Sequence, residues 1–484
     1  MSIQLTSAQV QIVCQAAAWL LLAIPGLGSA DANGTTLESA LDALVNDALA
    51  ANLELLGSDA EVAQRRAALD QARARLRPTV DFGLRYSRAD GGRTIDVPIG
   101  DLLNPVYDAL DDLLTTAGQP QRFEPIDNVS FPLLREREQE TAISLSQPIY
   151  DPRLGAAARA SRHEVAASEQ ARQALRATVL RDVRQGYFAL LAADESVRIL
   201  EASIELARAN VAVNESLYRN GRVTRDLVFR AEADLLEIEQ QRLEAANLTR
   251  QARSLINILR AAPLTEPVPV VPIDAEAVAA YRDEFTRRLA GRAPDLDLLS
   301  QLALERRREL AGLDAAIAAG LAREDVARAA FKPRVAFAVD AGYEGEEFSY
   351  GSERRFVLAS VIVRFNLYAG GGDQARMREA AALTDELRVT RERAAQQIRL
   401  EVQRALDDVE VAGASIETAG KRLDAAEGAF RIAARKRDLG AINQTEFIDA
   451  RRALTSARLN LNVTRARFLG RLSELEYAVG IEVP

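Results

Sequence analysis

The chain has 484 residues, of which 48% are hydrophobic, 5% aromatic and 27% charged, and its formal net charge is −9. A protein that binds nucleic acid needs a basic surface to neutralise phosphates, so this acidic balance excludes that class. The single cysteine, Cys14, and the single histidine, His163, exclude an internal disulfide and a Cys/His metal centre. The sequence also has no nucleophile elbow. We therefore expect no enzyme active site, no cofactor and no bound metal.

The first 30 residues carry no charge and contain an apolar run over 16–27, followed by small residues. This arrangement predicts a signal peptide over 1–30, removed near Ala30 or Ala32. A short buried N-terminal helix is the alternative. Beyond residue 30 no apolar stretch approaches the ~20 residues of a membrane-spanning helix, so a mature chain that spans a bilayer must do so with β-strands.

The chain repeats a set of features in the same order. The spacing from Tyr150 to Tyr368 is nearly the same as that from Gly221 to Gly440. Near-constant spacing over this distance indicates a duplicated architecture. The predicted organisation is a first structural repeat over 31–260, a linker and equatorial region over 261–293, and a second structural repeat over 294–484.

Each half contains two segments in which apolar residues alternate with polar or small ones. Val80, Phe82 and Leu84 form one such series, and Val335 and Phe337 begin another. Alternation with period two predicts strands with one apolar and one wet face, although a half-buried sheet in a soluble protein has the same pattern. The predicted strands cover 79–87, 141–150, 333–343 and 356–368.

An external loop is predicted over 88–139, between the two strands of the first half. It contains five prolines and an acidic, helix-like stretch, Asp101–Leu114. The loop is either a lid or receptor site at the surface, or a variable loop without a role.

Apolar residues at helical spacing, such as Val183, Tyr187 and Leu190, predict long amphipathic helices. The helix over 152–219 would be ~100 Å long, and a helix of that length needs other helices along its side, so we expect an extended helical bundle. The predicted helices are a first helix in each half over 52–76 and 294–331, long helices over 152–219 and 372–439, and return helices over 224–260 and 443–479.

Four predicted strands per chain are too few for a closed membrane barrel, which needs about eight. An open sheet in lipid would leave the N–H and C=O groups of its edge strands unsatisfied. Strands in a membrane must therefore be shared among several chains, as eight strands from two copies or twelve from three.

Two turns carry the most specific pattern in the sequence. Ala231 follows Gly221 by ten residues, and Ala450 follows Gly440 at the same spacing. Prolines at the helix-to-strand joints and a tyrosine before each long helix accompany these turns. In these features and in the order of its elements, the chain resembles the outer-membrane efflux proteins of the TolC family over almost all of its mature length.

The resemblance implies an α+β membrane protein that forms a homotrimer. Its long α-helices would form a trimeric helical barrel through the periplasm, with a belt around it that draws on 36–50, on 263–281 and on the C-terminus. Four β-strands per chain would join a shared twelve-stranded transmembrane β-barrel in the outer membrane of a Gram-negative bacterium.

The function that the resemblance implies is the exit duct of a tripartite efflux pump that conducts small molecules from the periplasm to the outside. Its partners would be a periplasmic adaptor protein, an inner-membrane pump and outer-membrane lipid. A type I protein-secretion duct is the alternative in the same class. A coiled-coil scaffold with no channel is the alternative in another class.

The resemblance also implies a periplasmic gate. Glu446 and Asp449 are three residues apart, share a helix face and lie one turn from the tip, so three chains would place six carboxylates around one axis. Asp226 and Arg437 would complete the gate, with Asp226 paired to Arg437 or to Arg225. An acidic helix start favoured by the helix dipole is the alternative.

The adaptor would dock on the two turns, whose glycines favour a tight reversal of the backbone. Ordinary glycine endings of helices are the alternative. The predicted docking residues are Gly221, Arg222, Val223, Thr224, Gly440, Ala441, Ile442 and Asn443.

Overall fold

The computed structural model of the protein describes residues 36–289, 295–348, 350–439 and 441–481. The predicted signal peptide over 1–30 and Gly440 lie outside the described residues. The chain divides into two compact units, and both halves of the sequence repeat contribute to each. The sheet unit comprises the described parts of 51–181, 291–411 and 471–484, and the helix unit comprises those of 1–50, 182–290 and 412–470.

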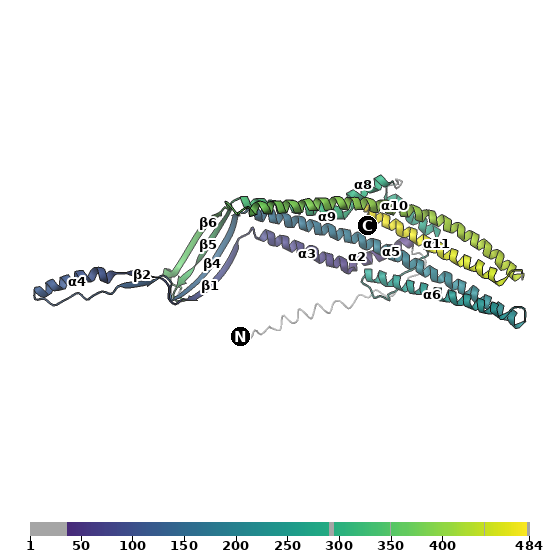
Figure 1. Ribbon diagram of the computed structural model, residues 1–484, viewed down its shortest axis with the longest axis horizontal. Helices are drawn as coiled ribbons and strands as arrows, with labels where there is room; N and C mark the ends of the chain where they lie inside the picture. Colours follow the sequence, from purple (N-terminus) through teal and green to yellow (C-terminus); the bar gives the residue numbers. More distant parts are fainter. Residues whose placement is uncertain (1–35, 290–294, 349, 440, 482–484) are drawn as a thin grey trace. The chain divides into compact units, whose positions relative to one another are not determined.

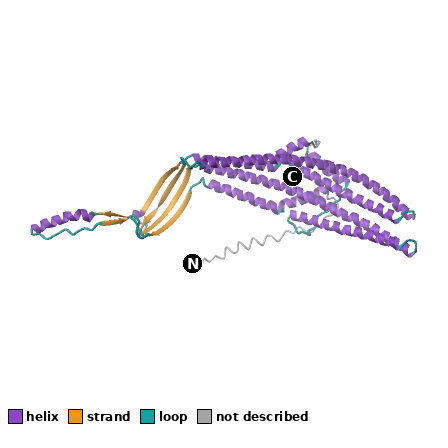
Figure 2. Ribbon diagram, in the orientation of Figure 1, coloured by secondary structure: helices purple, strands orange, loops and turns teal. Residues whose placement is uncertain are grey.

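The sheet unit contains a four-stranded antiparallel sheet with the order β1–β4–β5–β6 (Figures 1 and 2). The strands β1 and β6 form its two edges. The strands predicted over 79–87 and 141–150 fall within β1 and β4. The strand bounds are β1 (Thr79–Arg88), β4 (Arg137–Tyr150), β5 (Arg334–Gly345) and β6 (Arg355–Arg364).

The prediction of a strand over 356–368 is wrong at its end, because β6 stops at Arg364. Arg364 pairs with Arg334, the first residue of β5, so the backbone beyond it has no neighbouring strand to bond. Gly370 and Gly371 follow with φ of 61° and 81°, a left-handed conformation that glycine adopts without strain. These residues turn the chain into the next helix.

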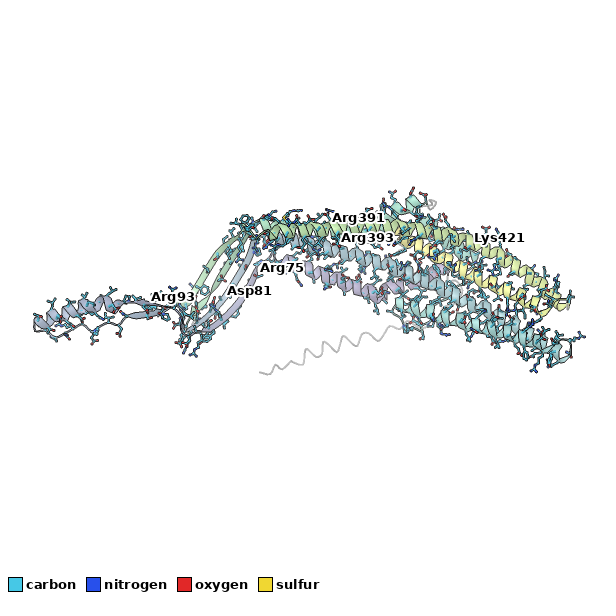
Figure 3. All side chains as sticks on the ribbon, viewed as in Figure 1. Arg75, Asp81, Arg93, Arg391, Arg393 and Lys421 are labelled. Carbon is cyan, nitrogen blue, oxygen red and sulfur yellow. The ribbon has the colours of Figure 1, made fainter. Side chains whose placement is uncertain are left out.

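Long helices make up most of the rest of the chain, and charged side chains cover them, as Arg391, Arg393 and Lys421 do on α10 (Figure 3). The helix predicted over 152–219 is observed as α5. Within the described residues, no helix combines the length and the apolar character needed to cross a membrane. The helices are α2 (Leu37–Ala51), α3 (Leu53–Ala74), α5 (Pro152–Arg219), α6 (Arg225–Leu259), α7 (Ala275–Arg288), α8 (Leu296–Arg306), α9 (Arg308–Arg328), α10 (Gly372–Asp438) and α11 (Gln444–Val479).

The prediction of one helix over 294–331 is also wrong, because α8 and α9 are separated at Arg307. This residue has φ −63° and ψ 120°, and only 7% of it is exposed. Its guanidinium donates two hydrogen bonds to Glu309, at 2.9 and 3.0 Å, and one to Glu401 at 3.2 Å. A buried charge needs such partners, and the extended residue places the side chain where it meets them.

The predicted external loop over 88–139 is a folded arm, here called the α4 arm (Figure 1). It contains α4 (Ile99–Thr116), which includes the acidic stretch expected to be helical, and an extended return segment over 119–128. Pro98 precedes α4 and Pro132 ends a strand, where a missing N–H costs little, whereas Pro105 lies inside α4. The arm is completed by a two-stranded ribbon of β2 (Thr94–Val97) and β3 (Val129–Pro132).

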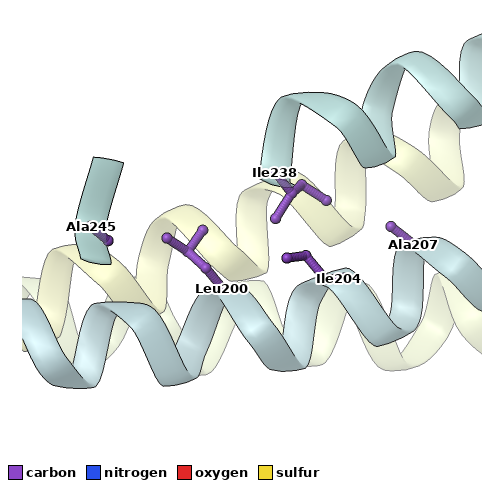
Figure 4. Packing of buried hydrophobic residues seen from close by; sticks show 5 residues of the cluster. All are labelled: Leu200, Ile204, Ala207, Ile238 and Ala245. Carbon is purple, nitrogen blue, oxygen red and sulfur yellow. The ribbon is translucent and has the colours of Figure 1, made fainter. Parts of the chain in front are cut away.

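In the helix unit, α5 and α6 pack through a cluster of buried aliphatic side chains (Figure 4). Leu200, Ile204 and Ala207 of α5 face Ile238 and Ala245 of α6. Full burial of one large aliphatic side chain stabilises the fold by about 1.5–3 kcal/mol. The cluster therefore holds the two helices of this hairpin side by side.

The linker predicted over 261–293 contains α7 and is anchored on α5. Tyr187 of α5 is fully buried and donates a hydrogen bond to the carbonyl of Pro269 at 3.1 Å. Burial raises the pKa of Tyr187 to about 12. Next to it, Phe188 meets Tyr281 edge to face, with 5.5 Å between ring centroids. An apolar contact and a satisfied hydroxyl thus fix the linker to the helix.

Candidate functional site

The first predicted docking turn joins α5 to α6. After the helix ends at Arg219, Gly221 has φ of 68°. The amide of Arg222 donates a hydrogen bond to the carbonyl of Leu217 at 2.9 Å. This combination is a Schellman ending, in which a left-handed residue allows the chain to satisfy the last carbonyls of the helix. Thr224, with φ −86° and ψ 158°, is the extended residue that precedes α6.

The second turn, between α10 and α11, has the same hydrogen bond at the equivalent positions. The amide of Ala441 donates to the carbonyl of Lys436 at 2.8 Å. Asn443 caps the next helix, since its side-chain oxygen accepts from the amide of Glu446 at 2.8 Å. The two turns therefore share this hydrogen bond but differ in their side chains.

The predicted docking residues that the structure describes lie at the surface. Beside them, Leu439 is 78% exposed and Tyr218 is 43% exposed. The sequence analysis missed both, because an apolar residue near the end of an amphipathic helix is ordinarily assigned to its buried face. The exposed docking residues are Gly221, Arg222, Thr224, Ala441 and Asn443, and the half-buried ones are Val223 and Ile442.

The two predicted gate acids, Glu446 and Asp449, are exposed at the start of α11. A carboxylate oxygen of Glu446 lies 3.4 Å from the ammonium of Lys436. Burial would lower the pKa of Arg452, but nearby carboxylates, Asp449 among them, raise it above its ordinary value. Each acid therefore interacts with a basic group of its own chain.

The other two predicted gate residues also make contacts within their own hairpins. The guanidinium of Arg437 lies 4.3 Å from the ring centroid of Phe447, a cation–π contact with a buried ring. Asp226 lies 4.0 Å from Arg230, one turn further along α6. The pairing of Asp226 with Arg437 or Arg225 stays a prediction.

Close to the gate acids in sequence, a buried ion pair joins α6 to α11. The terminal nitrogen of Arg451 lies 2.7 and 2.8 Å from the two carboxylate oxygens of Asp234, and each side chain is 2% exposed. Arg452 donates to Asp234 at 2.9 Å and to Glu237 at 2.7 Å. Burial lowers the pKa of Arg451, against the raising effect of Asp234. The sequence analysis missed this pair, because charged residues on an amphipathic helix are ordinarily assigned to solvent.

One face of the four-stranded sheet is apolar. Residues paired across neighbouring strands share a face, and Phe82, Ile143, Ala341 and Val357 form one such row. At the edges, Phe82 is 70% exposed and Val357 is 68% exposed. The large side chains of this face are Val80, Phe82, Leu84 and Tyr86 on β1, Ile143 and Leu145 on β4, Val335, Phe337 and Val339 on β5, and Val357, Val361 and Val363 on β6.

The opposite face of the sheet is polar on β1, β4 and β5, whereas β6 carries Phe356, Leu358 and Ile362 there. Asp81, labelled in Figure 3, stands in register with Ser144, which stands in register with Asp340. The hydroxyl of Ser144 donates to Asp340 at 2.6 Å. On the same face, Arg85 lies 2.7 Å from Glu140. Over β1, β4 and β5 the sheet therefore has one face suited to an apolar environment and one suited to water, and β6 is apolar on both faces.

Within the described residues, no group of three or more His, Cys, Asp or Glu side chains is placed to hold a metal ion. The single histidine, His163, is half-buried on α5. The turns, helix ends and sheet faces described above carry charged groups, hydrogen-bonding groups and exposed apolar side chains.

Sequence comparison finds one family match and curated relatives. A family model described as outer membrane efflux protein matches residues 134–259 and 299–480. The pyoverdine export outer membrane protein OpmQ of Pseudomonas putida is 25% identical over 298 residues, which are 60% of this chain and 59% of OpmQ. The alkaline protease secretion protein AprF of Pseudomonas aeruginosa is 20% identical over 351 residues, 70% of this chain and 69% of AprF.

Solved structures with the same fold are outer-membrane channels. The CusC structure matches with a TM-score of 0.74 and 18% identity, over 93% of this chain and 95% of CusC. The Campylobacter jejuni CmeC outer membrane channel matches with a TM-score of 0.71 and 17% identity, over 91% and 85%. The outer-membrane channel OprN matches with a TM-score of 0.70 and 18% identity, over 91% and 90%. At these identities the likeness shows the fold.

Proposed function

The chain belongs to the outer membrane efflux protein family, and on that premise we propose that it is the exit duct of a tripartite efflux pump. In this proposal three copies form one channel, and each adds four strands to a shared twelve-stranded barrel in the outer membrane. The family is one of efflux proteins and not of enzymes. A periplasmic adaptor and an inner-membrane pump would complete the machine and supply its energy.

The observation that carries the proposal is the two-faced sheet. Its apolar side chains, such as Phe82 and Val357, are exposed, and its polar row contains Asp81 and Asp340. In a barrel, the first face would meet lipid and the second would line a water-filled pore. A sheet of four strands has two edges, β1 and β6, whose backbone groups need partners in lipid. Joining β6 of one copy to β1 of the next satisfies both edges.

The helices also support an assembly of several chains. On α6, Phe229, Leu236 and Leu243 are 53%, 63% and 62% exposed. They recur every seven residues, which is the spacing of a seam between packed helices. Neighbouring protomers would cover this row in a helical barrel. The family resemblance favours three copies over two.

We further propose that the exposed turns dock the adaptor and that the acids beside them form the gate. In a ring of three chains, Glu446 and Asp449 would supply six carboxylates at the periplasmic mouth. Such a ring attracts cations and repels anions. Lys436 would compete with those cations for Glu446, because the two groups lie 3.4 Å apart.

A type I protein-secretion duct is the second candidate function. The similarity to AprF, a secretion protein, favours it, and the family description as efflux proteins favours small molecules. Loss of export by a deletion strain separates the two: accumulation of small toxic compounds supports efflux, and loss of one secreted protein supports secretion.

The first test is separation of inner and outer membranes on a density gradient, followed by the mass of the detergent-extracted protein. Recovery in the outer membrane at about three times the mass of the mature chain supports the shared barrel. The full chain has a mass of 52.7 kDa. Recovery as a soluble protein, or in the inner membrane, contradicts the proposal and favours the coiled-coil scaffold.

A further inference from the structure

The α4 arm is folded, because polar side chains hold α4 against the return segment. Asn104 accepts a hydrogen bond from the amide of Ile126 at 2.8 Å and donates one to its carbonyl at 3.0 Å. Asp111, 7% exposed, accepts from the amide of Arg122 at 2.9 Å. A Cβ added at Gly100 would lie 2.2 Å from the carbonyl oxygen of Ile126, so the helix and the segment touch there. One face of α4 is therefore already occupied.

An adjoining face of α4 carries an apolar stripe that is exposed in the described chain. Leu102, Val106 and Leu113 are 69%, 53% and 66% exposed, and Leu103 and Leu110 are 38% and 39% exposed. From Leu103 to Leu113 the spacing alternates between three and four residues, as in a helix that packs along another helix. A contiguous stripe of this kind marks an interaction surface.

The charges of α4 indicate whether lipid or protein covers this stripe. The helix contains Asp101, Asp108, Asp111 and Asp112 and no Lys or Arg. Helices that lie on membranes carry basic residues, which meet the phosphates of the lipids. This helix would bring carboxylates to those phosphates. The stripe therefore suits an apolar protein surface.

The position of the arm identifies that surface. The arm joins β1 to β4, and its base is closed by a hydrogen bond of 2.9 Å from the amide of Ala89 to the carbonyl of Glu136. In the proposed three-chain barrel, on which this inference rests, three arms rise from one rim around one axis. Each stripe then meets identical stripes at a high effective concentration. We propose that the α4 stripes of three protomers pack against one another and form a cap over the outer mouth of the channel.

Cysteine crosslinking in isolated outer membranes tests the cap. In a Cys14→Ser background, the chain has no other cysteine. Val106→Cys places a thiol in the stripe, and the matched control Asp108→Cys places one on the acidic side of the same helix. Oxidation should convert up to two thirds of the Val106→Cys monomer band to a disulfide-linked dimer, since only two of three thiols can pair, and should leave Asp108→Cys monomeric. Single-channel conductance should fall on oxidation of Val106→Cys alone and recover on reduction.

The mass of the unoxidised complex, measured on the same sample, distinguishes failure of the proposed function from failure of the cap. A protein that is not a trimer overturns the proposed function and the cap together. A trimer overturns the cap alone if its Val106→Cys thiol forms no dimer and reacts freely with a water-soluble maleimide. A thiol that is shielded only while lipid is present, or that crosslinks to a different protein, also overturns the cap and identifies what covers the stripe.

Discussion

Arg451 and Asp234 show how much one buried pair contributes to the joint between α6 and α11. Both side chains are 2% exposed, so removal of the guanidinium leaves a carboxylate that water barely reaches. Arg452 still donates a hydrogen bond to Asp234 in this variant, so we expect Arg451→Ala to reduce the free energy of unfolding by about 3 kcal/mol, the lower end of the range for breaking a buried pair. Urea unfolding of the detergent-extracted protein measures this loss.

Arg458→Ala is the matched control for that substitution. Arg458 lies 3.2 Å from Glu427, and the two side chains are 42% and 40% exposed. Water screens such a pair, so its loss should cost less than about 1 kcal/mol. Equal losses of unfolding free energy for Arg451→Ala and Arg458→Ala would show that burial does not increase the contribution of the Arg451–Asp234 pair to stability.

Glu309 predicts a dependence of stability on pH. Burial alone would raise the pKa of Glu309, but the hydrogen bond and charge of Arg307 lower it below the ordinary value. Folding then favours the ionised form, so the stabilisation is complete above about pH 4.3, the ordinary glutamate pKa, and is lost as the pH falls through the lowered value. The difference in unfolding free energy between the native protein and Glu309→Gln should therefore shrink as the pH falls from about 4.3 through the lowered pKa of Glu309. A difference that stays constant with pH contradicts this account.

At the scale of elements, the turn after α5 depends on one glycine. Gly221 has φ of 68°, where a side chain is strained by roughly 1–2 kcal/mol. Gly221→Ala should lower the free energy of unfolding by about that amount. Gly428→Ala is the control with the opposite sign: it lies inside α10 with no atom within 4 Å of an added Cβ, so alanine should stabilise the helix by roughly 0.5–1 kcal/mol. Thermal unfolding of both variants gives the comparison, and destabilisation of both by the same amount would contradict it.

Elements defined by local periodicity could be predicted from the sequence, and those that depend on distant partners could not. The helix α5 follows from apolar residues at helical spacing, and β1 follows from alternation at Val80, Phe82 and Leu84. The break between α8 and α9 depends on Arg307 and its contact with Glu401, 94 residues away. The Arg451 pair joins residues 217 apart. Periodicity predicts neither contact, because the local sequence pattern around each of these arginines is the same as that around an arginine exposed to solvent.

For the whole molecule, the predicted gate is a property of the assembly and not of one chain. The docking residues are predicted at turns, which local sequence indicates, whereas a ring of acids would depend on contacts between chains, which no local pattern predicts. The structure adds that Glu446 and Asp449 are exposed and near basic groups.

The double substitution Glu446→Ala/Asp449→Ala tests that gate. Replacement of six carboxylate side chains by methyl groups would widen a narrow mouth and should raise single-channel conductance. Loss of their charge should reduce the preference for cations. Bilayer recordings of the purified protein measure both quantities. Glu417→Ala, an exposed acid on α10, is the control and should leave them unchanged. Equal behaviour of the two variants would assign the gate to other residues.

The two turns of each chain have a consequence for the stoichiometry of a partner. Three chains around one axis would present six helix reversals with the same hydrogen bond after the first helix, arranged as an approximate six-fold ring. Arg222 and Ala441 occupy equivalent places in the two hydrogen-bond patterns, so charged and uncharged contacts alternate around that ring. A partner with six identical subunits would therefore bind in two classes of three, and added salt would weaken one class more than the other.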